Sequence, residues 1–206
     1  ENLKKTHLTS ENRLGLGLIF HITPSNIPTN FAYSLIFGLI TGNANVVKVP
    51  SKNFEQITII CKLIKKIVKK QNNFIKDKIT IVQYTKQDDY TKYISSICNG
   101  RVIWGGDKTI NQIRNFKLNE RAIELTFADR YSFCIMNPSK ISKLSDIELY
   151  NLAIKFYNDT YLVDQNACSS PHSILWLGKT DDKSINIFWN KLYEVVKKKY
   201  DLTDSA

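Results

Sequence analysis

The stretch LGLGLIFHITPSNIPTNFAYSLIFGLITGNANVVKVP, residues 14–50, decides the fold. Its first part, residues 14–23, predicts a buried strand because the run is short, apolar and rich in branched side chains. The loop PSNIP follows, and its last proline suits the start of the helix predicted over 29–42. A second apolar run, residues 44–50, predicts another strand. Strand, helix and strand in this order are typical of a parallel sheet.

Predicted strands and helices continue to alternate along the rest of the chain. A helix is predicted after a cap at Ser51 or Asn53, and three apolar runs predict strands: 78–84, 100–106 and 121–127. The other predicted elements are helices over 107–116, 145–159 and 185–200 and strands over 131–137 and 173–178. We therefore predict the α/β class, with a doubly wound parallel sheet covered by helices on both faces. We expect one domain over residues 1–125 and the opening of a second α/β domain over 126–206.

Composition and charge place the chain among globular proteins. It has 206 residues, of which 43% are hydrophobic and 23% charged, proportions that exclude a disordered protein. No apolar run has the length of a bilayer span, so we expect a cytoplasmic protein that binds no membrane. The net charge is +10, with lysines concentrated at helical spacing in 62–70 and 194–200. These lysines predict solvated helix faces rather than a nucleic-acid site, and an anionic cofactor would use part of the charge.

One cysteine lies in unusual surroundings. Cys168 belongs to DQNACSSPH, residues 164–172, where its neighbours are small or polar, whereas a structural cysteine normally lies in apolar sequence. Cys61 and Cys134 fall in apolar segments, and Cys98 has no partner motif. The four cysteines are widely spaced without a C-x-x-C pair, so we expect neither a disulfide framework nor a metal site. Cys168 is the candidate nucleophile, since a thiolate is a strong nucleophile.

Three stretches together resemble the aldehyde dehydrogenase superfamily. TPSNIP (23–28) is similar to its T-P-W-N-x-P loop, and TGNANVVKVPSK (41–52) is similar to its G-N-x-V-V-x-K-P-S-E segment. DQNACSSPH resembles the loop that carries the catalytic cysteine. Within the superfamily, HITPSNIPTNFAYSL (21–35) and DQNACSSPH resemble the LuxC group, the acyl-CoA and acyl-protein thioester reductases of bacterial luminescence. Members of the family continue well past this cysteine, so the resemblance implies that the second domain is truncated here.

The resemblance implies catalytic roles for three residues. Cys168 would attack the acyl carbonyl, and Asn26 would donate its side-chain amide to the oxyanion, a contact worth roughly 3 kcal/mol of barrier. Glu124 stands at the place of the family's general base, although only EL of that E-L-G-G-K motif is present. We expect Glu124 to deprotonate the thiol, and a carboxylate with a purely structural role is the alternative. His172 is expected to be structural, because Pro171 breaks the helical spacing to the cysteine.

The resemblance also implies a nicotinamide cofactor. The residues that would bind it come from the matching stretches and from the glycine pair after the fourth strand: Thr23, Pro24, Lys48, Ser51, Lys52, Gly105 and Gly106. NAD-preferring relatives carry a glutamate where Lys52 stands, and that glutamate repels the extra phosphate of NADP. A lysine attracts a phosphate instead, so we expect NADPH. A plain strand-to-helix turn is the alternative for the two glycines.

The resemblance implies an enzyme. It implies an NADPH-dependent oxidoreductase that converts a long-chain acyl-CoA or acyl-protein thioester to an aldehyde through an acyl-enzyme on Cys168. The implied partners are the acyl-transferase and synthetase subunits of a fatty acid reductase complex, and further copies of the protein in a homo-oligomer. One alternative is a reductase of another acyl donor, such as a short acyl-CoA or an acyl phosphate. Another is a nucleotide- or nucleic-acid-binding module without catalysis.

Overall fold

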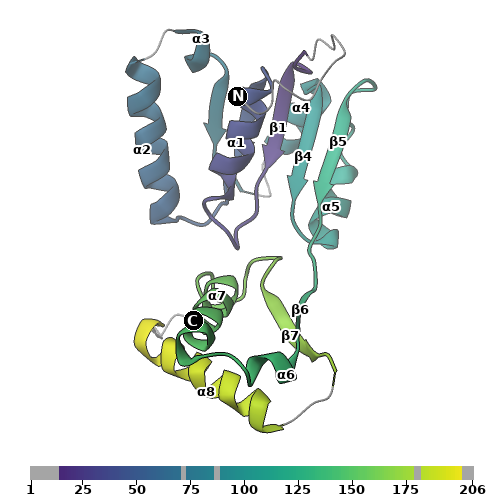
Figure 1. Ribbon diagram of the computed structural model, residues 1–206. Helices are drawn as coiled ribbons and strands as arrows, with labels where there is room; N and C mark the ends of the chain where they lie inside the picture. Colours follow the sequence, from purple (N-terminus) through teal and green to yellow (C-terminus); the bar gives the residue numbers. More distant parts are fainter. Residues whose placement is uncertain (1–13, 71–72, 86–88, 179–181, 201–206) are drawn as a thin grey trace, which may run out of the picture. The chain divides into compact units, whose positions relative to one another are not determined.

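The computed structural model describes residues 14–70, 73–85, 89–178 and 182–200 (Figure 1). The chain divides into two compact units, Glu1–Ala128 and Asp129–Ala206. Within the described residues, no helix is long and apolar enough to span a membrane.

The first unit is built on a five-stranded sheet in which all neighbouring strands run parallel. The strands lie in the order β3-β2-β1-β4-β5. Their bounds are Leu18–Ile22 (β1), Ala44–Lys48 (β2), Ile79–Val82 (β3), Gly100–Trp104 (β4) and Ile123–Phe127 (β5). The chain winds outward from β1 to β3 and then returns to the other side of β1, as in a doubly wound sheet. The predicted fold class is confirmed.

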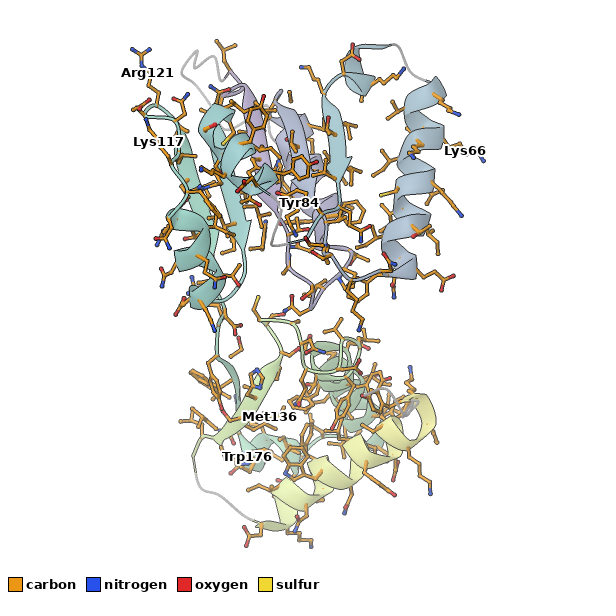
Figure 2. All side chains as sticks on the ribbon, turned by 180° about the vertical axis from the view of Figure 1, so that it is seen from behind. Lys66, Tyr84, Lys117, Arg121, Met136 and Trp176 are labelled. Carbon is orange, nitrogen blue, oxygen red and sulfur yellow. The ribbon has the colours of Figure 1, made fainter. Side chains whose placement is uncertain are left out.

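Helices flank both faces of this sheet (Figure 1). Their bounds are Asn30–Ile40 (α1), Glu55–Lys70 (α2), Asn73–Lys76 (α3), Tyr90–Ile97 (α4) and Asp107–Arg114 (α5). Helices α1 and α2 pack with β2 around Phe31 and Val47, whereas α4 and α5 pack with β1 and β4 around Phe20 and Ile103. Lys62, Lys65, Lys66 and Lys69 of α2 are exposed, and Figure 2 shows Lys66 extending away from the sheet.

The second unit pairs two parallel strands, β6 (Ser132–Met136) and β7 (Pro171–Trp176). The last residues of these strands, Met136 and Trp176, are partners in the pairing and are labelled in Figure 2. Three helices complete the unit: α6 (Pro138–Ile141), α7 (Asp146–Thr160) and α8 (Asp182–Lys199). Phe156 of α7 and Phe188 of α8 lie in its core. Residues 161–170, which include Cys168, connect α7 to β7, so this loop begins and ends on packed elements.

Candidate active site

Predicted cofactor-binding residues gather at one edge of the first unit's sheet. Thr23 and Pro24 follow β1, Lys48 ends β2, and Gly105 follows β4. Because β2, β1 and β4 are parallel neighbours, their carboxyl ends lie at the same edge. The winding of the chain reverses between β1 and β4, and doubly wound sheets bind ligands in the crevice at such a point. These residues therefore lie where this fold binds ligands.

The chain after β1 is anchored to β2 through Thr23. This side chain is buried, and its hydroxyl donates to the Lys48 carbonyl at 2.8 Å. The N–H of Thr23 donates to the same carbonyl at 3.2 Å. The exposed Asn26 follows three residues later, in the loop that leads to α1. Asn26 thus belongs to a loop that is fixed at its start.

Lysines and aromatic rings lie together at the end of β2 and on the segments that follow β2 and β3. Lys48 Nζ lies 5.1 Å from the centre of the Tyr84 ring, and Lys52 Nζ lies 5.6 Å from the centre of the Phe54 ring. The Ser51 hydroxyl donates to the Tyr84 carbonyl at 2.7 Å, which ties the two segments together. A depression of about 280 Å³ includes Tyr84, labelled in Figure 2, and is lined by Val82, Gln83, Tyr84, Tyr90 and Ile94. This edge can therefore offer positive charge and ring surface to a ligand.

Gly105 and Gly106 connect β4 to α5. The N–H of Gly105 donates to the Phe127 carbonyl at 3.2 Å, and the Gly106 carbonyl accepts the first hydrogen bonds of α5. Gly106 has a φ of −67°, which any residue adopts, and a Cβ built there meets no atom within 4 Å. Packing within the chain therefore does not require glycine at 106. The open space leaves room for a ligand close to the backbone.

Glu124 lies apart from this edge. It is the second residue of β5, about 10 Å before the carboxyl end of that strand at Phe127. Arg101 on β4 is buried and its Nε donates to Glu124 Oε2 at 2.9 Å, while Arg114 Nε donates to Oε1 at 2.7 Å. Burial alone would raise the pKa of Glu124, but hydrogen bonds from Arg114 and Arg101 outweigh burial and hold the pKa below its ordinary value. A carboxylate held in this way is a weak base, which favours the structural alternative.

Cys168 belongs to the second unit, and its side chain is exposed. The other three cysteines, Cys61, Cys98 and Cys134, are buried or half-buried. Burial raises the pKa of each of these three thiols, so less of each is present as the reactive thiolate. Exposure therefore distinguishes Cys168 from the other three cysteines.

The backbone around Cys168 forms a hydrogen-bonded turn. The N–H of Ser170 donates to the Ala167 carbonyl at 2.9 Å, so Cys168 is one of the two residues inside the turn. The hydroxyl of Ser132, the first residue of β6, donates to the Cys168 carbonyl at 2.7 Å. Sequence reasoning missed Ser132, because nothing local to residue 132 indicates that β6 pairs beside this loop.

His172 and its neighbour Tyr131 form an aromatic pair in the same unit. Their rings stack with centres 5.1 Å apart and planes inclined by 23°. Pro171 is the first residue of β7, so the segment from Cys168 to His172 is not helical. The ring contact gives His172 a structural partner, in line with the role expected for it.

A buried histidine that the sequence did not single out lies within the first unit. His21 of β1 is 3% exposed, its Nδ1 lies 2.7 Å from Ser34 Oγ, and its Nε2 lies 2.9 Å from Asn45 Oδ1. Burial lowers the pKa of His21, although the hydrogen bond to Asn45 opposes this effect. The neutral ring then carries its proton on Nε2, because Asn45 Oδ1 can only accept. The one signal in the sequence is a single polar residue in the apolar run LIFHI.

Solved structures with this fold include aldehyde dehydrogenases. They include the substrate-bound AldH of Staphylococcus aureus (TM-score 0.62, 12% identity), a lactaldehyde dehydrogenase (0.63, 15%) and the NAD⁺ complex of betaine aldehyde dehydrogenase from Staphylococcus aureus (0.62, 21%). The matches cover 93%, 93% and 89% of this chain but only 38%, 39% and 34% of the respective structures. This chain therefore spans less than half the length of each of these proteins. At these identities the likeness shows the fold alone.

Sequence comparison is more specific. No curated protein sequence matches the chain significantly. The sequence profile of the acyl-CoA reductase (LuxC) family, in contrast, matches residues 1–203, nearly the whole chain. The chain belongs to the LuxC family of acyl-CoA reductases.

Proposed function

We propose that the protein containing this chain is an acyl-thioester reductase that releases an aldehyde. One observation carries this proposal: a chain of the acyl-CoA reductase family presents an exposed thiol, Cys168, on a hydrogen-bonded turn. A thiolate is a strong nucleophile toward acyl carbon, and covalent capture splits a difficult reduction into two easier steps.

The first step is transfer of the acyl group to Cys168. Its thiol loses a proton to solvent, and the thiolate sulfur forms a bond to the acyl carbon. The bond between that carbon and the carrier sulfur then breaks, and the carrier leaves as a thiol after taking up a proton. The negative charge on the acyl oxygen in between is stabilised by the backbone N–H of Cys168 and, as the resemblance implies, by the amide of Asn26. Glu124 has no part in this step, because its carboxylate is bound by Arg101 and Arg114.

The second step is reduction of the acyl-cysteine, and NADPH is the proposed cofactor. When bound, the reduced nicotinamide supplies a hydride to the acyl carbon. Cys168 then leaves from the resulting thiohemiacetal, which releases the aldehyde and restores the thiol. The residues proposed to hold the cofactor are Thr23, Pro24, Lys48, Ser51, Lys52, Gly105 and Gly106. The open space at Gly106 and the lysines near the carboxyl ends of the strands support this assignment.

The substrate and the partners follow from the resemblance. We propose a long-chain acyl-CoA or acyl-protein thioester as substrate and a cytoplasmic homo-oligomer as the working form. Acyl-transferase and synthetase subunits are the proposed partners in a fatty acid reductase complex. A short acyl-CoA or an acyl phosphate is the alternative donor, and the same cysteine chemistry would serve either one.

The test is aldehyde formation from a long-chain acyl-CoA and NADPH by the protein in its natural length. We expect the wild type and the Cys61→Ser control to form aldehyde and Cys168→Ser to form none, because a hydroxyl is a far weaker nucleophile at neutral pH. Activity retained in Cys168→Ser overturns the proposal, and so does the absence of aldehyde from a long-chain acyl-CoA, a short acyl-CoA and an acyl phosphate alike. Nucleic-acid binding that weakens steeply with salt, in a protein without reductase activity, would instead favour a binding module.

A further inference from the structure

The turn that contains Cys168 is held by a contact from outside the loop. Cys168 and Ser169 are its two central residues, so the Cys168 carbonyl belongs to the central peptide of the turn. The Ser132 hydroxyl donates to this carbonyl at 2.7 Å. Ser132 is the first residue of β6, a strand paired along its length with β7. A residue of the sheet thus fixes the one peptide of the turn that does not take part in its closing hydrogen bond.

The central peptide of a turn has two alternative orientations, those of type I and type II turns. A flip between them reverses the direction of the Cys168 carbonyl and would break its hydrogen bond to Ser132. The type II orientation also requires a positive φ at Ser169, which is unfavourable for any residue but glycine. Ser169 is not among the described residues with positive φ. The hydroxyl of Ser132 and the backbone preference of Ser169 therefore favour the same orientation.

The segment just before the turn is also held in place. Asp164 and Gln165 have φ values of 51° and 58°, a left-handed conformation that is costly for two successive residues without glycine. The Tyr200 hydroxyl donates to Asp164 Oδ1 at 2.7 Å, and the Gln165 N–H donates to the Thr160 carbonyl at 2.9 Å. Strained backbone of this kind persists only where its surroundings hold it, and it is concentrated at functional sites.

We propose that Ser132 is a positioning residue for the nucleophile. By fixing the central peptide, its hydroxyl holds the turn in one conformation, so that Cys168, which carries both the sulfur and the N–H, keeps one orientation within the loop. The sulfur can then attack the acyl carbon while the N–H meets the oxygen of the same acyl group. This inference rests on the proposed function, because the orientation matters only if Cys168 takes up an acyl group.

Two reactions of the Cys168 thiol distinguish a loss of positioning from partial unfolding of the loop. Acylation by a thioester develops negative charge on the acyl oxygen, which the Cys168 N–H stabilises. Alkylation by iodoacetamide is a direct displacement at carbon and develops no such charge. A change in the orientation of the turn should therefore slow acylation more than alkylation, whereas partial unfolding of the loop should alter both.

The experiment measures both rate constants at Cys168 by mass spectrometry, from pH 6 to 9, in the protein of natural length. We expect Ser132→Ala to slow acylation by a long-chain acyl-CoA about fivefold, the effect of one ordinary hydrogen bond. Alkylation should stay within about twofold of the wild type, with an unchanged pH profile. Ser132→Thr keeps a hydroxyl and should restore acylation. The matched control is Ser142→Ala, because the Ser142 hydroxyl donates to the carbonyl of Ser139 and not to the loop.

The outcomes distinguish failure of the positioning role of Ser132 from failure of the proposed function. If Ser132→Ala is acylated at the wild-type rate, or if its acylation and alkylation slow equally, the positioning role alone is overturned. Failure of Ser132→Thr to recover also overturns it. If the wild type is alkylated but never acylated, the proposed function fails and the positioning role fails with it.

Discussion

Replacing Glu124 with glutamine tests the ion pair that joins β4 to β5. The change keeps the size of the side chain but removes the negative charge that faces Arg101. The Arg101 side chain is 3% exposed, and its Nη1 donates to the carbonyls of Ile113 and Phe116, each at 3.3 Å. Without Glu124 the guanidinium keeps these neutral acceptors but remains buried without a counter-charge. We therefore expect Glu124→Gln to destabilise the first unit.

The size of the effect follows from this burial. Removing one partner of a buried ion pair costs about 3–5 kcal/mol, because the other charge stays buried. The Glu124 side chain is 16% exposed, and a glutamine oxygen still accepts one hydrogen bond. Both features favour the lower end, about 3 kcal/mol. For a unit of this size, that loss lowers Tm by roughly 10 °C.

Thermal unfolding followed by circular dichroism measures the change, and hydrogen exchange of the 100–127 segment assigns it to these strands. The matched control is Glu120→Gln. Glu120 pairs with Lys117 at 2.9 Å, but both side chains are more than 75% exposed, so its loss should leave Tm nearly unchanged. Equal stability of Glu124→Gln and Glu120→Gln would refute the reasoning. A large loss of Cys168 acylation in Glu124→Gln without a change in Tm would restore Glu124 as the base.

The same ion pair sets a pH dependence. The pKa of Glu124 is lower in the folded chain than its ordinary value, so the folded state releases the proton more readily than the unfolded state. Its contribution to the free energy of unfolding is complete above the ordinary pKa of about 4.3 and is lost as pH falls through the folded pKa. The stability advantage of the wild type over Glu124→Gln should therefore shrink below about pH 4. An advantage that is constant down to pH 2 would contradict this assignment.

Three further variants test the candidate cofactor edge and the histidine within the sheet. The Cβ that Gly106→Ala adds meets no neighbouring atom, so the change should cost about 1 kcal/mol of stability or less. It should nevertheless weaken NADPH binding in calorimetric titration. An unchanged affinity for NADPH would count against a ligand at this position. Lys52→Glu should narrow or reverse a preference for NADPH over NADH, because a charge-assisted phosphate contact is worth roughly 1.5–3 kcal/mol; an unchanged ratio of Kd values would exclude that contact. The pKa of His21 is lowered by burial, so the unfolded chain binds more protons below about pH 6.5 and wild-type stability should fall from pH 7 to 5. His21→Gln should flatten that fall, and an equal fall in both proteins would refute the assignment.

The parallel sheet could be predicted because each strand is a short apolar run and the long helices carry an apolar face. Helix α4 could not be found by the same signal. The residues that it buries include Ile94 and Ser95, a face too short and too polar to stand out. A parallel crossover from β3 to β4 nevertheless needs a connecting segment, usually a helix, so topology could have indicated α4 where periodicity did not.

In the candidate site, too, short local motifs could be predicted from the sequence, whereas contacts between distant segments could not. Cys168 and the loops after β1, β2 and β4 could be predicted because short motifs carry them. The contact of Arg101 with Glu124 depends on the register of β4 against β5, and that of Ser132 with Cys168 depends on the pairing of β6 with β7. Neither register can be read from one segment alone. The interpretation of Glu124 as a base rests on a two-letter match, and the sequence around Glu124 does not reveal its contact with Arg101.

Cys168 as the acyl acceptor is tested most directly by trapping the acyl-enzyme. The protein of natural length is incubated with a long-chain acyl-CoA without reduced nicotinamide, so that the acyl group cannot be reduced. Intact and peptide mass spectrometry should find one acyl group, located on Cys168, removable by hydroxylamine and missing from Cys168→Ala. An acyl group on Cys61, Cys98 or Cys134, or one that persists in Cys168→Ala, would contradict the assignment of Cys168 as the nucleophile.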